Sequence, residues 1–252
     1  MKAVFSEKYK DQKDEIHSLV RNFENEGELF GAGDRNQIKI FELNGNKINV
    51  KAFKVPNLFN KIVYKFFRQS KAERSFDYAN RLISKNIGTP HPIAYIEEKR
   101  LLGFGKSYYV SEHLTYDLTY RELTKDPNYP RKEEILRAFT KFTFHLHEQE
   151  IEFLDHSPGN TLIKFHDAGF EFFLVDLNRM EFGIMDFGER MKNFRRLTPK
   201  KEMVAVMASE YAKLYNKPEA DIFAAMWNAT ENFQEKFHRK KRLKKKLKFW
   251  KN

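Results

Sequence analysis

The spacing of apolar residues changes several times along the chain, and each change predicts a different element. Residues 1–26 have four apolar positions at helical spacing, which predicts a helix: Ile16, Leu19, Val20 and Phe23. Residues 37–43 and 47–54 alternate between apolar and polar instead, as strands with one buried face do. Asn44-Gly45 between them is a typical hairpin turn. A shorter apolar stretch at 28–31 adds a strand before them.

The rest of the chain continues this strand pattern briefly and then becomes mainly helical. An amphipathic stretch at 70–86 ends at Gly88, with Pro90 and Pro92 behind it, and therefore predicts a helix with a clear stop. Further periodicities predict strands at 92–98 and 106–112, a helix at 131–150, a hairpin that ends at Asp176, and helices from about 186 onward.

This order predicts an α+β fold with two lobes. The N-terminal lobe, residues 1–114, has a helical extension and a five-stranded antiparallel sheet with one main helix. The catalytic lobe, residues 115–238, is mainly helical. Residues 239–252 form a basic tail. The chain length of 252 residues suits two lobes of this size.

Charge is concentrated at the C-terminal end of the sequence. The stretch 239–252 carries nine Lys or Arg and no acid, so removing it lowers the net charge from +11 to about +2. Such a run is expected to attract an anionic membrane surface, and its apolar residues could enter the interface. A solvated tail and nonspecific nucleic-acid binding are the alternatives. The sequence has no Cys, no signal-peptide pattern and no apolar run long enough to span a bilayer.

Three oxygen-bearing side chains mark the candidate active site. Asp155 and Asn160 lie five positions apart in a loop with Pro158-Gly159 between them, and Asp176 ends the second strand of the following hairpin. A hairpin brings these positions to one end, and carboxylate and amide oxygens suit magnesium. The spacing resembles the kinase catalytic loop, in which Asp155 would orient the acceptor hydroxyl while Asn160 and Asp176 hold the metal. The alternative is two turn residues and a strand-end cap.

Asp186 is a rival for the metal because it begins a literal Asp-Phe-Gly, the magnesium-binding triplet of kinases. It does not follow a clean strand from the Asn160 hairpin, whereas Asp176 ends the most apolar run of the region. We assign the metal to Asp176 and expect Asp186 to cap a helix.

The nucleotide phosphates should meet a lysine and a glycine-containing loop in the N-terminal lobe. Lys51 lies in the third strand where kinases place this lysine, and we prefer it to Lys54 at the strand end. Gly31 and Gly33 lie between the first two strands, where backbone amides could approach phosphates. This loop lacks the full glycine pattern and is a weak signal by itself.

Two further sets of residues complete the expected nucleotide site. A kinase pairs its strand lysine with an acid on the next helix, and Glu73 and Asp77 are both candidates, with a slight preference for Glu73. Backbone groups from Glu112 to Leu114 should meet the adenine.

Two other motifs are rejected. The stretch 103–107 lacks the first Gly of a P-loop and lies between strands. His145 and His147 do not share a helix face, so a metal pair is not expected and His147 should be buried.

Several segments within residues 25–190 resemble the lipopolysaccharide kinase family, which includes Kdo kinases and core heptose kinases and is related to RIO kinases. The most specific segments are "DHSPGN" and "SKAERS", and others are "GDRNQIKIF", "VKAFKVPN", "GTPHPIAYIEE" and "KSYYVSEHL". The chain departs from the general kinase pattern where Phe153-Leu154 replaces His-Arg and Asp176 begins Asp-Leu-Asn.

The resemblance implies a two-lobed, protein-kinase-like fold. It also implies an ATP- and magnesium-dependent kinase that phosphorylates a sugar hydroxyl, with Kdo the expected sugar, on a lipid A-linked core precursor. It also implies a peripheral position at the inner face of the cytoplasmic membrane, with no specific nucleic-acid partner. A RIO-like protein kinase and a small-molecule phosphotransferase use the same chemistry and remain open. A pseudokinase is disfavoured because Lys51, Asp155, Asn160 and Asp176 are all present.

Overall fold

The computed structural model describes residues 1–31, 36–54, 69–100 and 103–249, which form two compact units. Unit 1 comprises Met1–Thr115 and Leu174–Asn178, and unit 2 comprises Tyr116–Phe173 and Arg179–Asn252. The predicted lobe boundary after residue 114 lies next to the division after Thr115. The short segment Leu174–Asn178, which contains Asp176, belongs with unit 1 although it follows a strand that lies mostly in unit 2.

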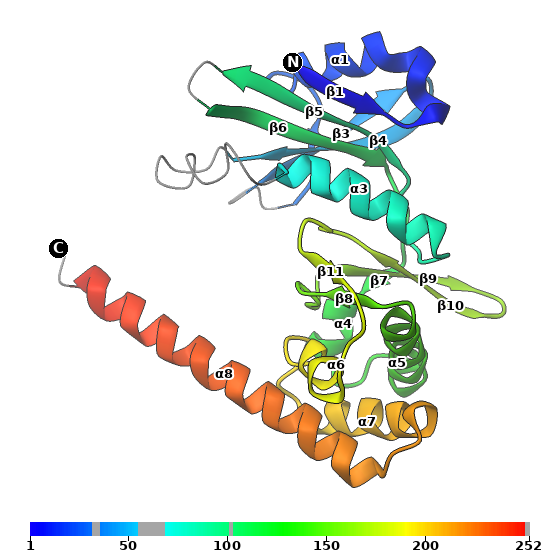
Figure 1. Cartoon of the computed structure of the whole chain (residues 1–252), viewed down its shortest axis with the longest axis vertical. Coiled ribbons are helices and arrows are strands. Elements are labelled where there is room, and N and C mark those ends of the chain that lie inside the picture. The colour runs from blue at the N-terminus through cyan, green and yellow to red at the C-terminus, as the bar shows by residue number, and fades with distance from the viewer. Residues whose placement is uncertain (32–35, 55–68, 101–102, 250–252) are drawn as a thin grey trace. The chain divides into compact units, whose positions relative to one another are not determined.

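Unit 1 is built on a six-stranded antiparallel sheet in the order β1-β5-β6-β4-β3-β2 (Figure 1). Its strands are β1 (Lys2–Phe5), β2 (Glu28–Leu29), β3 (Gln37–Leu43), β4 (Asn46–Phe53), β5 (Pro92–Arg100) and β6 (Gly103–Glu112). The five predicted strands are confirmed. The stretch 103–107 begins β6, and the structure therefore agrees with the rejection of a P-loop, which needs a helix there.

The sixth strand, β1, corrects the prediction for the N-terminal segment. The helix predicted over 1–26 is confined to a 3-10 helix η1 (Glu7–Gln12) and α1 (Lys13–Arg21). Lys2–Phe5 pairs instead with β5, and the Ser6 amide donates to the Ile93 carbonyl at 2.8 Å. Four residues are too few for periodicity to separate strand from helix, and the otherwise unpaired edge of β5 decides the conformation.

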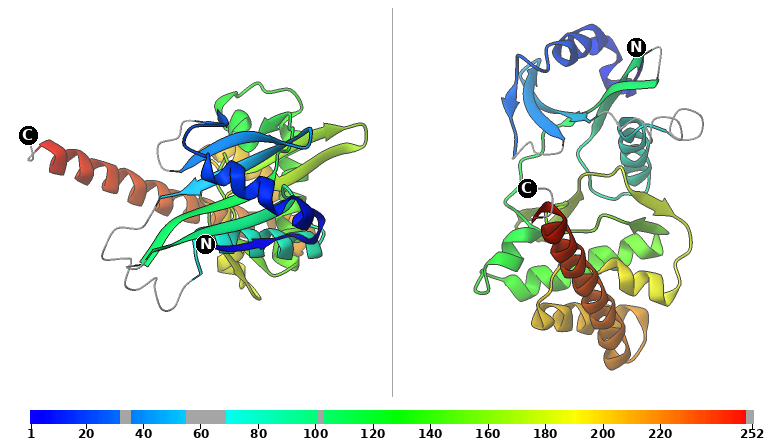
Figure 2. Two further views of the ribbon diagram at one scale, coloured as in Figure 1. Left: turned by 90° about the horizontal axis from the view of Figure 1, so that it is seen from above. Right: turned by 90° about the vertical axis from the view of Figure 1, so that its left-hand side faces the viewer.

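The sheet of unit 1 has a helix on each face, as Figure 2 shows for α1. One face packs on α1 and the other on α3 (Lys71–Ser84). In β4, Ile48 and Val50 are buried against the α1 side. Phe53 packs on the α3 side. Lys51 lies two positions before Phe53 in β4 and therefore on the same face of the strand, so the predicted alternation is confirmed. The Ser70 hydroxyl caps α3 by accepting from the Glu73 amide at 3.0 Å.

Unit 2 is mainly helical, as predicted, with two small sheets. Its helices are α4 (Tyr120–Lys125), α5 (Lys132–Glu148), α6 (Phe187–Asn193), α7 (Lys201–Tyr215) and α8 (Glu219–Phe249). Its strands form the sheets β10-β9-β7 and β11-β8: β7 (Leu118–Thr119), β8 (Ile151–Phe153), β9 (Thr161–His166), β10 (Gly169–Leu174) and β11 (Met180–Phe182). A buried aromatic and aliphatic core joins α5, α7 and the first part of α8.

The basic segment predicted as a tail from residue 239 continues α8 as far as Phe249. Only the first part of α8 contributes side chains to the core, and every described side chain from Glu235 to Lys246 is exposed (Figures 1 and 2). Within the described residues, every helix is too short or too polar to traverse a bilayer.

Candidate active site

Lys51 and Asp176 are 125 positions apart in the sequence, and the structure brings them together. The Lys51 Nζ lies 2.6 Å from Asp176 Oδ1, and the Lys51 side chain is only 13% exposed. The lysine stem lies against the Phe53 ring, with Nζ 5.3 Å from the ring centre. Of the two lysines weighed from the sequence, Lys51 is therefore held inside unit 1, whereas Lys54 is exposed just beyond β4.

Asp176 has an unusual backbone conformation with a φ of 61°. Aspartate and asparagine tolerate this left-handed region better than other non-glycine residues, but such conformations are uncommon and cluster at functional sites. The Asn178 amide donates to the same Oδ1 at 2.5 Å. Leu174, two positions before Asp176, is anchored by its amide to the Gly88 carbonyl at 2.9 Å. Contacts of the residues before and after Asp176 thus hold its carboxylate in place, with Oδ1 against Lys51.

Asp186 has a different structural role. It is the N-cap of α6, where its Oδ1 accepts from the Glu189 amide at 2.7 Å and Glu189 Oε2 accepts from the Asp186 amide at 2.9 Å. This reciprocal pair is a capping box. The expectation that Asp186 caps a helix is confirmed, because its carboxylate accepts from the first turn of α6.

The structure pairs neither candidate helix acid with Lys51. Glu73 Oε1 accepts from Lys2 Nζ at 2.7 Å and from the Tyr95 hydroxyl at 3.1 Å. Asp77 accepts from the Gln69 amide at 2.8 Å, and burial raises the pKa of its carboxyl. The slight preference for Glu73 did not take Lys2 into account, because no pattern in the chain indicates that β1 lies beside β5.

The segment expected to meet the adenine follows β6. The Glu112 amide donates to the His91 carbonyl at 2.9 Å, and the His113 amide to the Lys47 carbonyl at 3.0 Å. These two bonds use the amides of Glu112 and His113 within the protein. The Glu112 carboxylate binds Lys8 at 2.7 Å and Tyr9 at 2.6 Å. Burial acts to raise its pKa, but these two hydrogen bonds lower it overall.

The predicted glycine loop is only partly described. Gly31 has a φ of +83°, which glycine adopts without strain, and a Cβ there would meet nothing within 4 Å. Gly33 lies outside the described residues. Of the two glycines expected to let backbone amides approach the phosphates, the structure therefore describes Gly31 alone.

In unit 2, Asp155 and Asn160 are brought together in the loop between β8 and β9. The Asn160 amide nitrogen donates to the Asp155 carbonyl at 2.8 Å, and the Asn160 main-chain amide to the Ser157 carbonyl at 2.9 Å. The Asp155 Oδ1 also forms an ion pair with Arg196 Nη1 at 2.7 Å. Arg196 was missed from the sequence, because nothing in a single chain connects positions 41 residues apart.

The donor groups fit a magnesium-bound nucleotide. Asn160 uses its nitrogen to close the loop, which leaves its amide oxygen as a ligand. Asp176 has a second carboxylate oxygen beyond the one shared by Lys51 and Asn178. Magnesium prefers such oxygen ligands and commonly takes only one or two from the protein, with substrate phosphates and water completing its shell. The two residues assigned to the metal therefore have the required chemistry.

Behind the loop lies a buried hydrogen-bond network centred on Asn193. His147 Nε2 and His156 Nδ1 lie 3.3 and 3.2 Å from Asn193 Oδ1, and His147 Nδ1 lies 2.9 Å from the Tyr211 hydroxyl. Burial lowers the pKa of His147 to about 3 and that of His156 to about 4. Both rings are therefore neutral near pH 7. His147 is buried and His145 exposed, which confirms the prediction made from the helix pattern.

These two histidines should make the protein sensitive to mild acid. Their folded pKa values lie below the ordinary 6.5, so the unfolded chain takes up protons first as the pH falls. Stability is fully present above pH 6.5 and is lost toward pH 4, by about 2 kcal/mol per histidine at pH 5. Urea unfolding at about pH 7.5 and pH 5 measures the loss. His147→Gln should reduce it, whereas His145→Gln, at an exposed position on the same helix, should not. An unchanged loss in His147→Gln would contradict this assignment.

Unit 1 contains a buried strand lysine paired with an aspartate, and unit 2 contains a loop with an aspartate and an asparagine. These are groups that a kinase uses. The class is therefore that of kinase-like phosphotransferases. The family model described as "Lipopolysaccharide kinase (Kdo/WaaP) family" matches residues 23–242, and the chain belongs to this family. The resemblance found in residues 25–190 is confirmed.

One solved structure supports the fold. It is described as "WaaP in complex with acyl carrier protein" and matches with a TM-score of 0.65 and 17% identity over 94% of this chain and 99% of that chain. At this identity the likeness shows the fold, and it confirms the kinase-like fold class. A search of curated proteins gave no match.

Proposed function

We propose that the protein transfers the γ-phosphoryl group of magnesium-bound ATP to a sugar hydroxyl, with Kdo the candidate sugar, on a lipid A-linked lipopolysaccharide core precursor. The observation that carries the proposal is the Lys51–Asp176 pair at 2.6 Å, in a chain of the lipopolysaccharide kinase family. An ammonium and a metal-binding carboxylate are the groups that a kinase uses on the nucleotide phosphates.

Each residue has a role in this reaction. Asp155 orients the acceptor hydroxyl and accepts its proton, and Lys51 neutralises phosphate charge. Asn160 and Asp176 would hold magnesium, which would stabilise the negative charge on the phosphate oxygens. Backbone groups from Glu112 to Leu114 would meet the adenine, and Gly31 allows close approach of the backbone to the phosphates.

The direct test is incubation of the protein with ATP, magnesium and purified Kdo-lipid A, followed by mass spectrometry. We expect one added phosphate, which tandem fragmentation places on the sugar. A heptose-containing core acceptor, a mixture of protein substrates and a set of small alcohols are run in parallel. Phosphate on the heptose alone would replace Kdo as the acceptor, and phosphate on proteins alone would favour the RIO-like alternative.

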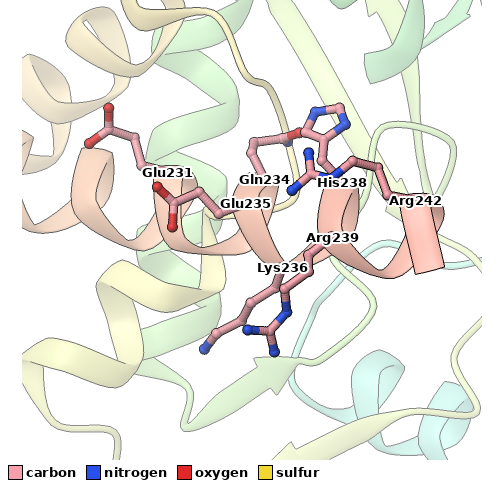
Figure 3. Close-up of a pocket in the computed structure, with 7 residues that line it drawn as sticks. All are labelled: Glu231, Gln234, Glu235, Lys236, His238, Arg239 and Arg242. Atoms are coloured by element: carbon pink, nitrogen blue, oxygen red, sulfur yellow. The ribbon is translucent and has the colours of Figure 1, made fainter.

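The exposed part of α8 suits attachment to the anionic inner face of the cytoplasmic membrane. After Glu235 the sequence has no acid, and basic side chains four apart, such as Lys236 and Lys240, repel one another. Figure 3 shows Lys236 and Arg239 projecting on one side of α8 and His238 and Arg242 on the other. An anionic surface would relieve this repulsion, at roughly 1 kcal/mol for each basic side chain close to it.

Deleting residues 239–252 should abolish binding to vesicles with anionic lipid while activity on a short soluble acceptor remains. Sedimentation with anionic and with neutral vesicles measures the binding, and raised salt should weaken it. A matched variant changes the same Lys and Arg residues to Gln and keeps Leu243 in place. Unchanged sedimentation and unchanged activity on micellar acceptor in both variants would contradict the proposal. Binding to acyl carrier protein, named for the related structure, is measured in the same series.

A further inference from the structure

The end of α6 contacts three consecutive residues that lead into the catalytic loop. The Asn193 amide nitrogen donates to the Phe153 carbonyl at 3.0 Å. Arg196 Nη1 lies 3.4 Å from the Leu154 carbonyl and 2.7 Å from Asp155 Oδ1. Asn193, the last residue of α6, and Arg196, in the turn that follows it, thus hold the main chain at 153 and 154 and the carboxylate at 155.

Both side chains are themselves held in place. Asn193 is buried, and its oxygen accepts from the neutral rings of His147 and His156. Its nitrogen therefore points toward Phe153. Arg196 stacks over the Phe233 ring of α8, with its guanidinium carbon 5.7 Å from the ring centre. A guanidinium supported in this way has fewer conformations to lose when it binds a carboxylate.

We propose that Arg196 is a positioning residue for phosphoryl transfer, held by the α6 turn that begins at Asn193. Arg196 binds Asp155 Oδ1 and fixes the carboxylate rotamer, so that the other oxygen is left for the acceptor hydroxyl. Asn193 fixes the position of the main chain at Phe153, two residues before Asp155. The role rests on the proposed function, because it requires Asp155 to orient an acceptor. Phosphoryl transfer depends strongly on such orientation, since the protein contributes chiefly positioning and electrostatics.

The adjacent arginine provides a matched control. Arg195 is half-buried like Arg196, but its Nη1 donates to the Lys192 carbonyl within the same turn at 3.0 Å. Arg196→Gln and Arg195→Gln therefore remove the same charge one position apart. We expect Arg196→Gln to lower kcat by about 10- to 100-fold with the KM for ATP nearly unchanged, and Arg195→Gln to leave both within about twofold. Arg196→Lys should recover part of kcat, because it restores the charge without the planar fork.

A purely structural role would lower the melting temperature without separating kcat from KM, so both are measured for each variant. Transfer to the lipid acceptor and magnesium-dependent hydrolysis of ATP by water are assayed side by side. If the wild type fails on the lipid, the proposed function fails, and hydrolysis still compares the variants because Asp155 would orient the water. Equal rates for Arg196→Gln and wild type in the assay that works would overturn the inference, as would an equal loss in Arg195→Gln.

Discussion

Asp176→Asn should lower kcat by about 10³-fold, with the protein folded. Asparagine tolerates the left-handed backbone at this position, where φ is 61°, and its side chain has the same shape. The change removes the negative charge that binds Lys51 at 2.6 Å and that would bind magnesium. Phosphoryl transfer to the lipid acceptor, measured over a series of magnesium concentrations, should show a low rate that excess metal only partly restores.

Asp186→Asn is the matched control, because it makes the same chemical change in the literal Asp-Phe-Gly. Asparagine caps helices about as well as aspartate, so the α6 cap should persist and activity should stay within about twofold of wild type. Asp186→Ala removes the cap and should cost about 1 kcal/mol of stability, again with little effect on the chemistry. A dead Asp186→Asn beside an active Asp176→Asn would overturn the metal assignment.

The contrast between these two aspartates shows what the local sequence pattern can predict. Asp186 has helix-forming residues after it and Glu189 three positions on, which is the signature of a capping box. Asp176 instead follows the apolar strand β10. Both assignments depend only on neighbouring residues, and alternation in β4 likewise predicted which face Lys51 would occupy. Where local structure follows from neighbouring residues, as in the α6 cap and in β4, a single sequence was sufficient.

The misses all involve partners far away in the sequence. The sequence left the acid beside Lys51 undecided between Glu73 and Asp77, while the structure gives Lys51 to Asp176 and Glu73 to Lys2. The Glu73–Lys2 pair depends on β1, a four-residue edge strand. Pairing with the edge of β5 determines the conformation of this strand more than its own residues do. No periodicity contains that information.

Arg196 and Asn193 were missed for a related reason. Asn193 is the last residue of α6 and Arg196 lies in the turn that follows it, and no local pattern indicates a partner for either. Their contacts with residues 153–155 arise because α6 packs beside β8. The loop positions Asp155 and Asn160 could be proposed from the sequence, whereas the side chains that contact the loop could be found only from the fold.

Asp155→Asn is expected to lower kcat by roughly 10²- to 10⁴-fold, because the amide keeps the shape but cannot accept the acceptor proton. The KM for ATP should change little, since Asp155 acts on the acceptor. Asp167→Asn, on the exposed turn between β9 and β10, is the control and should be neutral. Steady-state rates with the lipid acceptor, and tight binding of a nonhydrolysable nucleotide, separate lost chemistry from lost nucleotide binding.

The double variant Asp155→Asn with Arg196→Gln makes this prediction sharper. Arg196 contacts the same carboxylate at 2.7 Å, so its effect on kcat should vanish once the carboxylate is gone. Residues that act as one unit are not additive, and the double variant should be about as slow as Asp155→Asn alone. Fully multiplicative losses would instead show that Arg196 acts on another part of the reaction. Near wild-type activity in Asp155→Asn would remove the candidate base from the mechanism altogether.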